Sequence, residues 1–140
     1  GVIVVNVTGG LQDQCGFTKE DGTYLTAKDY VELKSNHRGK YKEHGEWVKP
    51  VFPSNISLQG SPQTPYIFDD RCSFEDAGES LYEWYKVGPE ERERCGELGR
   101  QFVLGEGKMT SKHMSESFIK NIDRCFQKWN PKKRYTMEVI

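Results

Sequence analysis

The sequence lacks the features that mark disulfide-stabilised, zinc-binding or membrane-spanning proteins. Its four cysteines form no C-x-x-C pair and have no histidine at a ligand spacing, which argues against a zinc site and against a disulfide framework. No apolar stretch approaches the roughly 18 residues of a transmembrane helix, and the first residues lack the basic start of a signal peptide. We therefore expect a cytoplasmic protein with reduced thiols and no membrane span.

The chain also lacks an excess of charge of either sign. Twenty basic and 21 acidic residues give a formal net charge of -1, and both signs are mixed along the chain. Without a basic patch, no nucleic-acid partner is expected. At 140 residues, the chain is long enough for one domain, 1–140, with a core that needs no cross-links.

What the sequence does contain is an almost unbroken β-branched run at its start, Val2 to Val7, followed directly by Thr8-Gly9-Gly10. Such a run predicts a strand covered on both faces, as in a parallel sheet. Paired glycines allow a sharp turn, and a short helix beginning at Leu11 would aim free N–H groups at a ligand such as a phosphate. The alternative is that Gly9 and Gly10 form only a tight connection between a strand and a helix.

A second strand is predicted from Thr64 to Asp70, with Pro65 at its start where no ladder hydrogen bond is lost. Ligands of open α/β sheets bind beyond the carboxyl ends of the strands, so Asp69, Asp70 and the Thr8 turn are expected to share one crevice. The two aspartates are adjacent in sequence and have no third ligand near them, so no metal site is predicted.

Between these strands, residues 15–63 are predicted to form a long, loop-rich insertion. Residues 28–34 suit a short helix with Thr26 as its N-cap, and two prolines confine residues 46–53 to an edge strand or extended segment. Lysines and an arginine at positions 34–42 either meet an anionic ligand or are simply solvated.

Three amphipathic helices are predicted after Cys72, beginning near Ser73, at Gly88-Pro89 and near Thr110. Gly96 and Gly99 are poor helix formers, which suggests close packing at these positions. The stripes expected to face the core are Phe74, Ala77, Leu81, Trp84 and Tyr85; Cys95, Leu98, Gly99, Phe102 and Val103; and Met114, Phe118, Ile119, Ile122, Cys125, Phe126 and Trp129.

The opening strand followed by T-G-G-L-x-D, Thr8 to Asp13, resembles the nucleotide-sugar-binding lobe of glycogen and starch synthases. It is also similar to the two-lobed GT-B glycosyltransferases of large viruses and phages. The later order of a strand, a helix beginning S-x-E-D, a P-E-E-R helix, G-x-x-G-R and a long closing helix agrees with the end of that lobe. The resemblance covers the two ends of the chain, and the insertion at 15–63 departs from it.

The resemblance implies an α/β fold with a Rossmann-like, open and mainly parallel sheet and flanking helices, as part of a GT-B C-terminal lobe. In this family the T-G-G turn lies against the diphosphate of a UDP-, ADP- or GDP-sugar, and no metal or other cofactor is needed. The residues to which it assigns diphosphate binding are Thr8, Gly9, Gly10 and Leu11, and those of the wider donor crevice are Asp13, Asp69 and Asp70.

Family members also use a basic pair, a glutamate and an acceptor-binding first lobe, all upstream of this turn. We therefore expect a fragment that binds the donor but transfers no sugar alone, with an unknown acceptor and with a missing N-terminal lobe or a second copy as partner. The tail 130–140 either packs on that lobe or forms a loose end or edge strand. The alternatives are a non-catalytic binding or interaction module and an unrelated phosphate-binding α/β enzyme.

Overall fold

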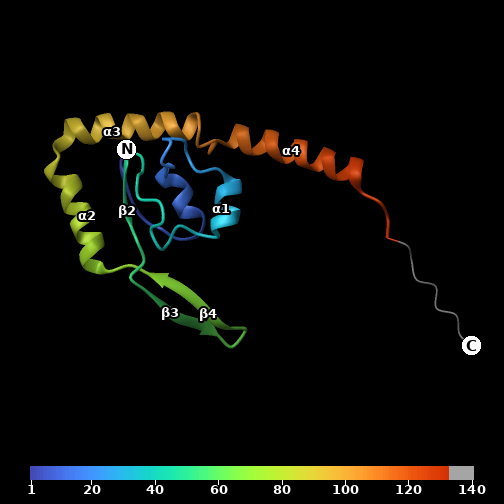
Figure 1. Cartoon of the computed structure of the whole chain (residues 1–140), viewed down its shortest axis with the longest axis horizontal. Helices are drawn as coiled ribbons and strands as arrows, with labels where there is room; N and C mark the ends of the chain where they lie inside the picture. The colour runs from blue at the N-terminus through green and yellow to red at the C-terminus, as the bar shows by residue number, and fades with distance from the viewer. Residues whose placement is uncertain (133–140) are drawn as a thin grey trace, which may run out of the picture. The chain divides into compact units, whose positions relative to one another are not determined.

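The computed structural model describes residues 1–132, and the chain divides into two compact units, residues 1–108 and residues from Met109 onward (Figure 1). The first unit contains every element except the last helix. Most of the predicted tail, 133–140, lies outside the described residues.

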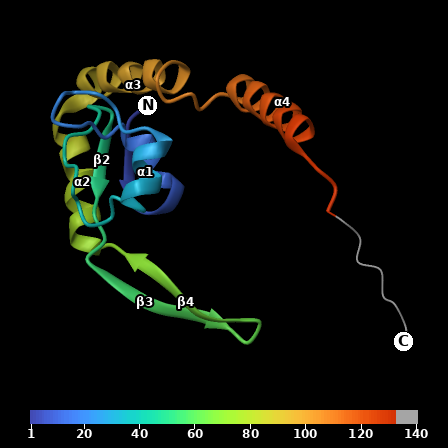
Figure 2. The same cartoon turned by 45° about the vertical axis from the view of Figure 1, so that its right-hand side comes forward.

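The centre of the first unit is a parallel pair of strands, β1 (Ile3–Asn6) and β2 (Val48–Val51), in which Ile3 pairs with Val48. Helix α2 (Phe74–Lys86) packs on one side of this pair, and the 3-10 helix η1 (Gly9–Cys15) packs on the other (Figures 1 and 2). Pro50, which pairs with Val5, has no N–H to donate, which suits the edge position that its sequence predicted.

The prediction that Thr64–Asp70 is the second strand of this sheet is wrong. Strands β3 (Asn55–Ser61) and β4 (Thr64–Arg71) form a separate antiparallel hairpin. Their connection is only two residues long, which allows antiparallel pairing alone, because a parallel crossover needs a dozen residues or more. The α/β class is confirmed, but as two small sheets of which one is parallel.

The predicted helix starts are confirmed by their caps. The side chains of Ser73 and Thr110 accept hydrogen bonds from the N–H groups of Asp76 and His113, which begins α2 and the final helix α4 (Ser111–Lys128). Thr26 and Asp29 form a reciprocal capping box at α1 (Ala27–Leu33), and Pro89 lies in the first turn of α3 (Gly88–Leu104). Among residues 1–132, no helix combines the length and the apolar character that a membrane span requires.

The core of the first unit surrounds Trp47, whose side chain stacks on Phe102 of α3 at a centroid distance of 4.7 Å. A Cβ added at Gly99 would lie 2.7 Å from the Trp47 ring, and one added at Gly96 would lie 2.8 Å from the Gly1 nitrogen. The prediction that the α3 glycines permit close packing is confirmed.

The predicted core stripe of α2 is wrong, because only Trp84 of its five residues is buried while Phe74 is 90% exposed. Taken by itself, α4 likewise exposes its whole stripe, including Phe118 and Phe126. Periodicity identifies an apolar face, but whether that face is covered depends on what packs against it. Of the α3 stripe, Cys95, Gly99 and Phe102 are buried as expected.

Gly99→Ala tests the packing against Trp47. We expect it to lower the free energy of unfolding by about 1–3 kcal/mol, because the added methyl displaces a buried indole. Gly78→Ala in α2 is the matched control, since nothing lies within 4 Å of its added methyl, and we expect a gain of about 0.5–1 kcal/mol from helix propensity. Urea denaturation measures both changes, and equal effects at the two positions would contradict the packing argument.

Candidate functional site

The glycine turn lies at the carboxyl end of β1, as predicted, although its helix begins at Gly9 and not at Leu11. Gly9 has a φ of +47°, in the left-handed region that glycine adopts without strain. A Cβ placed on Gly9 or Gly10 would meet nothing within 4 Å, and both residues are exposed. The turn therefore leaves open space for a ligand beside its backbone.

Two backbone donors at this turn are free. The Leu11 N–H donates to the Thr8 carbonyl at 3.1 Å and the Thr8 N–H to the Asn6 carbonyl at 2.9 Å. Within residues 1–132, no protein acceptor is found for the N–H groups of Gly9 and Gly10, which open the 3-10 helix. Of the three amides that the sequence assigned to a diphosphate, these two remain available.

The structure brings together two predicted site residues from distant parts of the chain. The Thr8 hydroxyl donates to the Asp70 carboxylate at 2.7 Å, across 62 residues of sequence. Asp69 is the neighbour of Asp70 in β4 and is exposed, and since successive strand residues point to opposite faces, it does not join this contact. One aspartate of the pair therefore reaches the turn.

Asp13 does not take part in this contact. It is a largely exposed residue beside fully buried Cys15 and half-buried Tyr30. Burial raises the pKa of the Asp13 carboxyl. Burial, and then the Asp13 charge, raise the pKa of the Cys15 thiol to about 12, and the same two causes raise the pKa of Tyr30. Cys15 is therefore an un-ionised core thiol and no nucleophile.

Two polar residues that sequence reasoning missed lie next to the turn. Gln12 is 4% exposed, and its Oε1 accepts from the N–H of fully buried Asn36 at 2.8 Å, which ties η1 to the insertion. In the described part of the chain, Asn6 Oδ1 is the buried side-chain atom that has no hydrogen-bond partner. No local sequence signal marks either residue, since the Gln12 contact is made with a distant segment and the burial of Asn6 depends on the fold.

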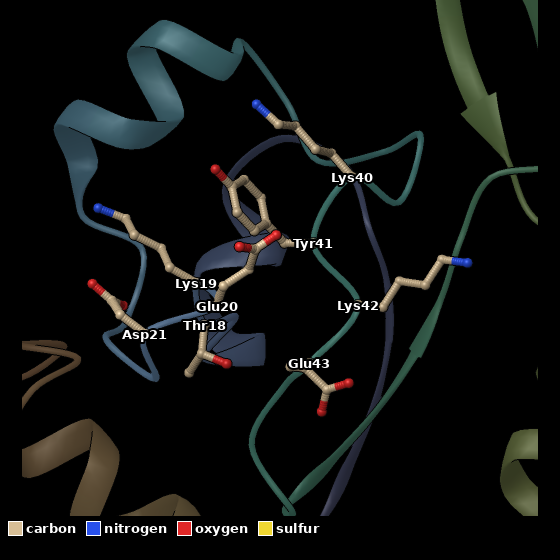
Figure 3. Close-up of a pocket in the computed structure, with 8 residues that line it drawn as sticks. All are labelled: Thr18, Lys19, Glu20, Asp21, Lys40, Tyr41, Lys42 and Glu43. Atoms are coloured by element: carbon tan, nitrogen blue, oxygen red, sulfur yellow. The ribbon is translucent and has the colours of Figure 1, made fainter.

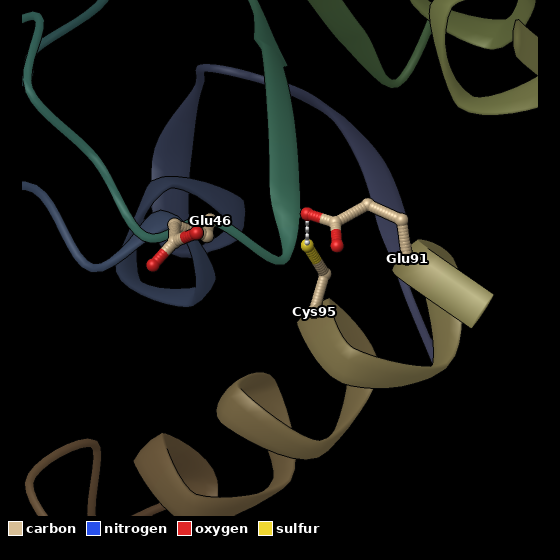
Figure 4. Close-up of side chains that lie close together, drawn as sticks. All are labelled: Glu46, Glu91 and Cys95. Carbon is tan, nitrogen blue, oxygen red and sulfur yellow. Dashed lines mark hydrogen bonds between the residues drawn. The ribbon is translucent and has the colours of Figure 1, made fainter. Parts of the chain in front are cut away.

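A second cluster of polar side chains joins the start of β2 to α3 (Figure 4). Glu46, Glu91 and Cys95 place potential metal ligands within 4.8 Å of one another. The Arg94 guanidinium contacts Glu46 at 2.5 Å and Glu91 at 2.7 Å. Because one cation already pairs with both carboxylates, the cluster is best described as an ion-pair network.

Thiol labelling tests the burial of Cys15. In the folded chain at mildly alkaline pH, we expect exposed Cys125 to react readily with a maleimide and Cys15 to react only on unfolding, since its raised pKa and burial leave little accessible thiolate. Asp13→Asn should leave Cys15 slow, because burial is the larger cause of the shift. Peptide mass spectrometry reads out both sites, and equal labelling rates would show that η1 does not close over Cys15.

In comparisons with known proteins, no protein-family model, no curated protein and no solved structure matches the chain.

Proposed function

We propose that this chain is the donor-binding portion of a glycosyltransferase, a partial GT-B C-terminal lobe of Rossmann-like type that holds a nucleotide-diphosphate sugar. The observation that carries the proposal is the open glycine turn at the carboxyl end of a parallel strand, where the Gly9 and Gly10 amides have no acceptor among residues 1–132. Fixed N–H donors of this kind stabilise a diphosphate leaving group as its charge grows.

In this proposal the glycine turn binds the diphosphate, whereas Asp70 binds hydroxyl groups. Its carboxylate accepts a hydrogen bond from the Thr8 hydroxyl, so that hydroxyl does not donate to a phosphate. The negative charge of the carboxylate also disfavours a bare diphosphate nearby. A carboxylate is instead a good acceptor for sugar or ribose hydroxyls. The site therefore suits a diphosphate that is conjugated to a sugar better than free phosphate compounds.

The proposal concerns binding and assigns transfer to no residue of this chain. It identifies no acceptor, and it assigns the roles of the family's basic pair and glutamate to no residue of this chain. We also infer a reducing, cytoplasmic location, which is supported by the four cysteines, Cys15, Cys72, Cys95 and Cys125, all of which are free thiols in the structure.

Nucleotide titration followed by amide NMR shifts tests donor binding. With UDP, ADP, GDP and their glucose conjugates, we expect saturable shifts for Thr8–Asp13 with one nucleotide and a larger response to its glucose conjugate. Gly10→Val should abolish them, because its side chain enters the open space at the turn, while Gly78→Ala should bind like the unaltered chain.

Two further arms make this titration decisive. Asp70→Asn removes the charge and keeps an acceptor, so free UDP, or whichever nucleotide binds, should bind more tightly and the preference for the sugar conjugate should shrink. Inorganic pyrophosphate distinguishes a general phosphate site, since equal binding of pyrophosphate would favour an unrelated phosphate-binding enzyme. Absence of any shift at millimolar concentrations would count against donor binding.

A second candidate function, an interaction module, is favoured by the β3–β4 hairpin. Ile56, Leu58 and Phe68 are each more than half exposed and share one face with Asp70, because directly paired residues of antiparallel strands lie on the same face. Contiguous exposed apolar side chains beside an unpaired strand edge are typical of an association surface. A second copy of the chain is the simplest partner.

Sedimentation equilibrium tests self-association through this face. We expect the chain to dimerise with rising concentration, and a Leu58→Thr, Phe68→Thr variant to stay monomeric, because threonine keeps the strand preference while removing the apolar surface. Ile67→Thr, on the opposite face, is the control and should still dimerise. A chain that is monomeric at every concentration, or a control that dissociates like the double variant, would rule this surface out.

A further inference from the structure

The insertion between Phe17 and Glu43 encloses a surface hollow of about 740 Å³. Its lining does not include the glycine turn. It lies in the loop-rich insertion and includes Lys40 and Lys42, two of the basic residues that the sequence assigned either to an anionic ligand or to solvent. In the view of Figure 3 the Tyr41 ring lies in the middle of the side chains, with Lys19 and Asp21 on one side and Lys42 on the other. The six charged residues that line the hollow are Lys19, Lys40, Lys42, Glu20, Asp21 and Glu43.

The wall that carries Tyr41 is fixed by a buried polar network. Asn36 is fully buried; its Nδ2 donates to the Tyr41 carbonyl at 2.8 Å, and its Oδ1 accepts from the Tyr41 N–H at 3.0 Å. The Asn36 N–H in turn donates to Gln12 of η1. Because these bonds use the Tyr41 backbone, they hold its position. The partly buried Tyr41 side chain packs in part against the hydrophobic core and in part lines the hollow.

The opposite wall is a tight turn from Lys19 to Thr23, closed by the Lys19 N–H donating to the Thr23 carbonyl at 2.9 Å. Its charged groups are already engaged, since Lys19 pairs with Asp29 at 2.7 Å and Asp21 accepts from Thr23. The two walls are joined by the Thr18 N–H, which donates to the Glu43 carbonyl at 3.0 Å. The hollow is therefore bounded on both sides by hydrogen-bonded backbone.

The charged side chains of the hollow that are not already paired carry two positive and two negative charges, so their sum is zero. Within residues 1–132, Lys40, Lys42, Glu20 and Glu43 make no ion pair, so the hollow offers two ammonium donors and two carboxylate acceptors. The carboxylates oppose an anion and the lysines oppose a cation. A neutral ligand with many hydroxyl groups can use both kinds of group, because each hydroxyl both donates and accepts.

The Tyr41 ring adds an apolar surface whose backbone is held in place. The Lys40 ammonium lies over this ring, 5.3 Å from its centroid. A sugar that stacks on this face of the ring has to displace the ammonium, which then remains beside the ring as a hydrogen-bond donor. Aromatic faces carry negative charge density that attracts the positively polarised C–H groups of a flat apolar face. A sugar ring has such a face and hydroxyl groups around its rim.

From this combination we propose that the hollow around Tyr41 binds a neutral saccharide. Binding at this hollow depends neither on the donor site nor on the proposed function. The hollow and the glycine turn are both attached to η1, through Gln12 and through Gly9 respectively, so both ligands would be held by one rigid element.

The test is a titration of the full chain with maltotriose, lactose and N,N′-diacetylchitobiose, followed by amide NMR shifts. We expect saturable shifts confined to residues 18–43 with at least one of these sugars. Tyr41→Leu should weaken this binding about tenfold, since it keeps an apolar side chain but removes the aromatic face. Tyr41→Phe keeps the ring and should bind like the unaltered chain.

The outcomes of this experiment distinguish saccharide binding at the hollow from nucleotide binding at the glycine turn. Shifts at residues 18–43 with neutral sugars, and none at Thr8–Asp13 with nucleotides, would support the saccharide site and reject donor binding. Glucose 6-phosphate is the anionic probe, and binding of it without the neutral sugars would overturn the proposal in favour of an anion site. Absence of shifts with every sugar, or equal binding by Tyr41→Leu with the fold intact by circular dichroism, would also overturn it.

Discussion

The enclosure of one indole ring is the interaction on which the first unit depends. Trp47 is 6% exposed, and the backbone of Gly16, Gly45 and Gly99 approaches its ring so closely that none of the three has room for a Cβ without displacement. Its Nε1 donates to the Gln14 carbonyl at 2.9 Å. One side chain thereby joins η1, the start of β2 and α3, and the three glycines are the points at which the backbone comes closest to its ring.

Contacts on both sides stabilise the short parallel pair of strands at the centre of the first unit. β1 and β2 have four residues each, too few to form a stable sheet on hydrogen bonds alone. Trp84 of α2 donates to the Ile3 carbonyl at 3.1 Å, and Lys49 pairs with Glu83 at 2.8 Å. Burial on the η1 side and these polar contacts on the α2 side together hold the pair.

η1 connects the core to both candidate ligand surfaces. Its first residues form the open glycine turn, Gln12 anchors the insertion through Asn36, and Cys15 is fully buried. A 3-10 helix positioned this firmly presents its terminal amides with little loss of freedom on binding, which is the condition for preorganised recognition. The Thr8 contact with Asp70 extends the same rigidity to the hairpin.

The sequence by itself determined the features that depend on neighbouring residues: the caps at Thr26, Ser73 and Thr110, the glycine turn after the first strand and the small residues of α3. The sequence also predicted that Asp70 lies near the Thr8 turn, although it placed Asp70 in the parallel sheet and not in a separate hairpin. Tertiary structure alone decided the pairing of β1 with β2 and the burial of Gln12 against Asn36. The physical reason is that caps and turns satisfy hydrogen bonds within a few residues. Strand partners and covered faces depend on which distant segments meet, and periodicity does not encode that.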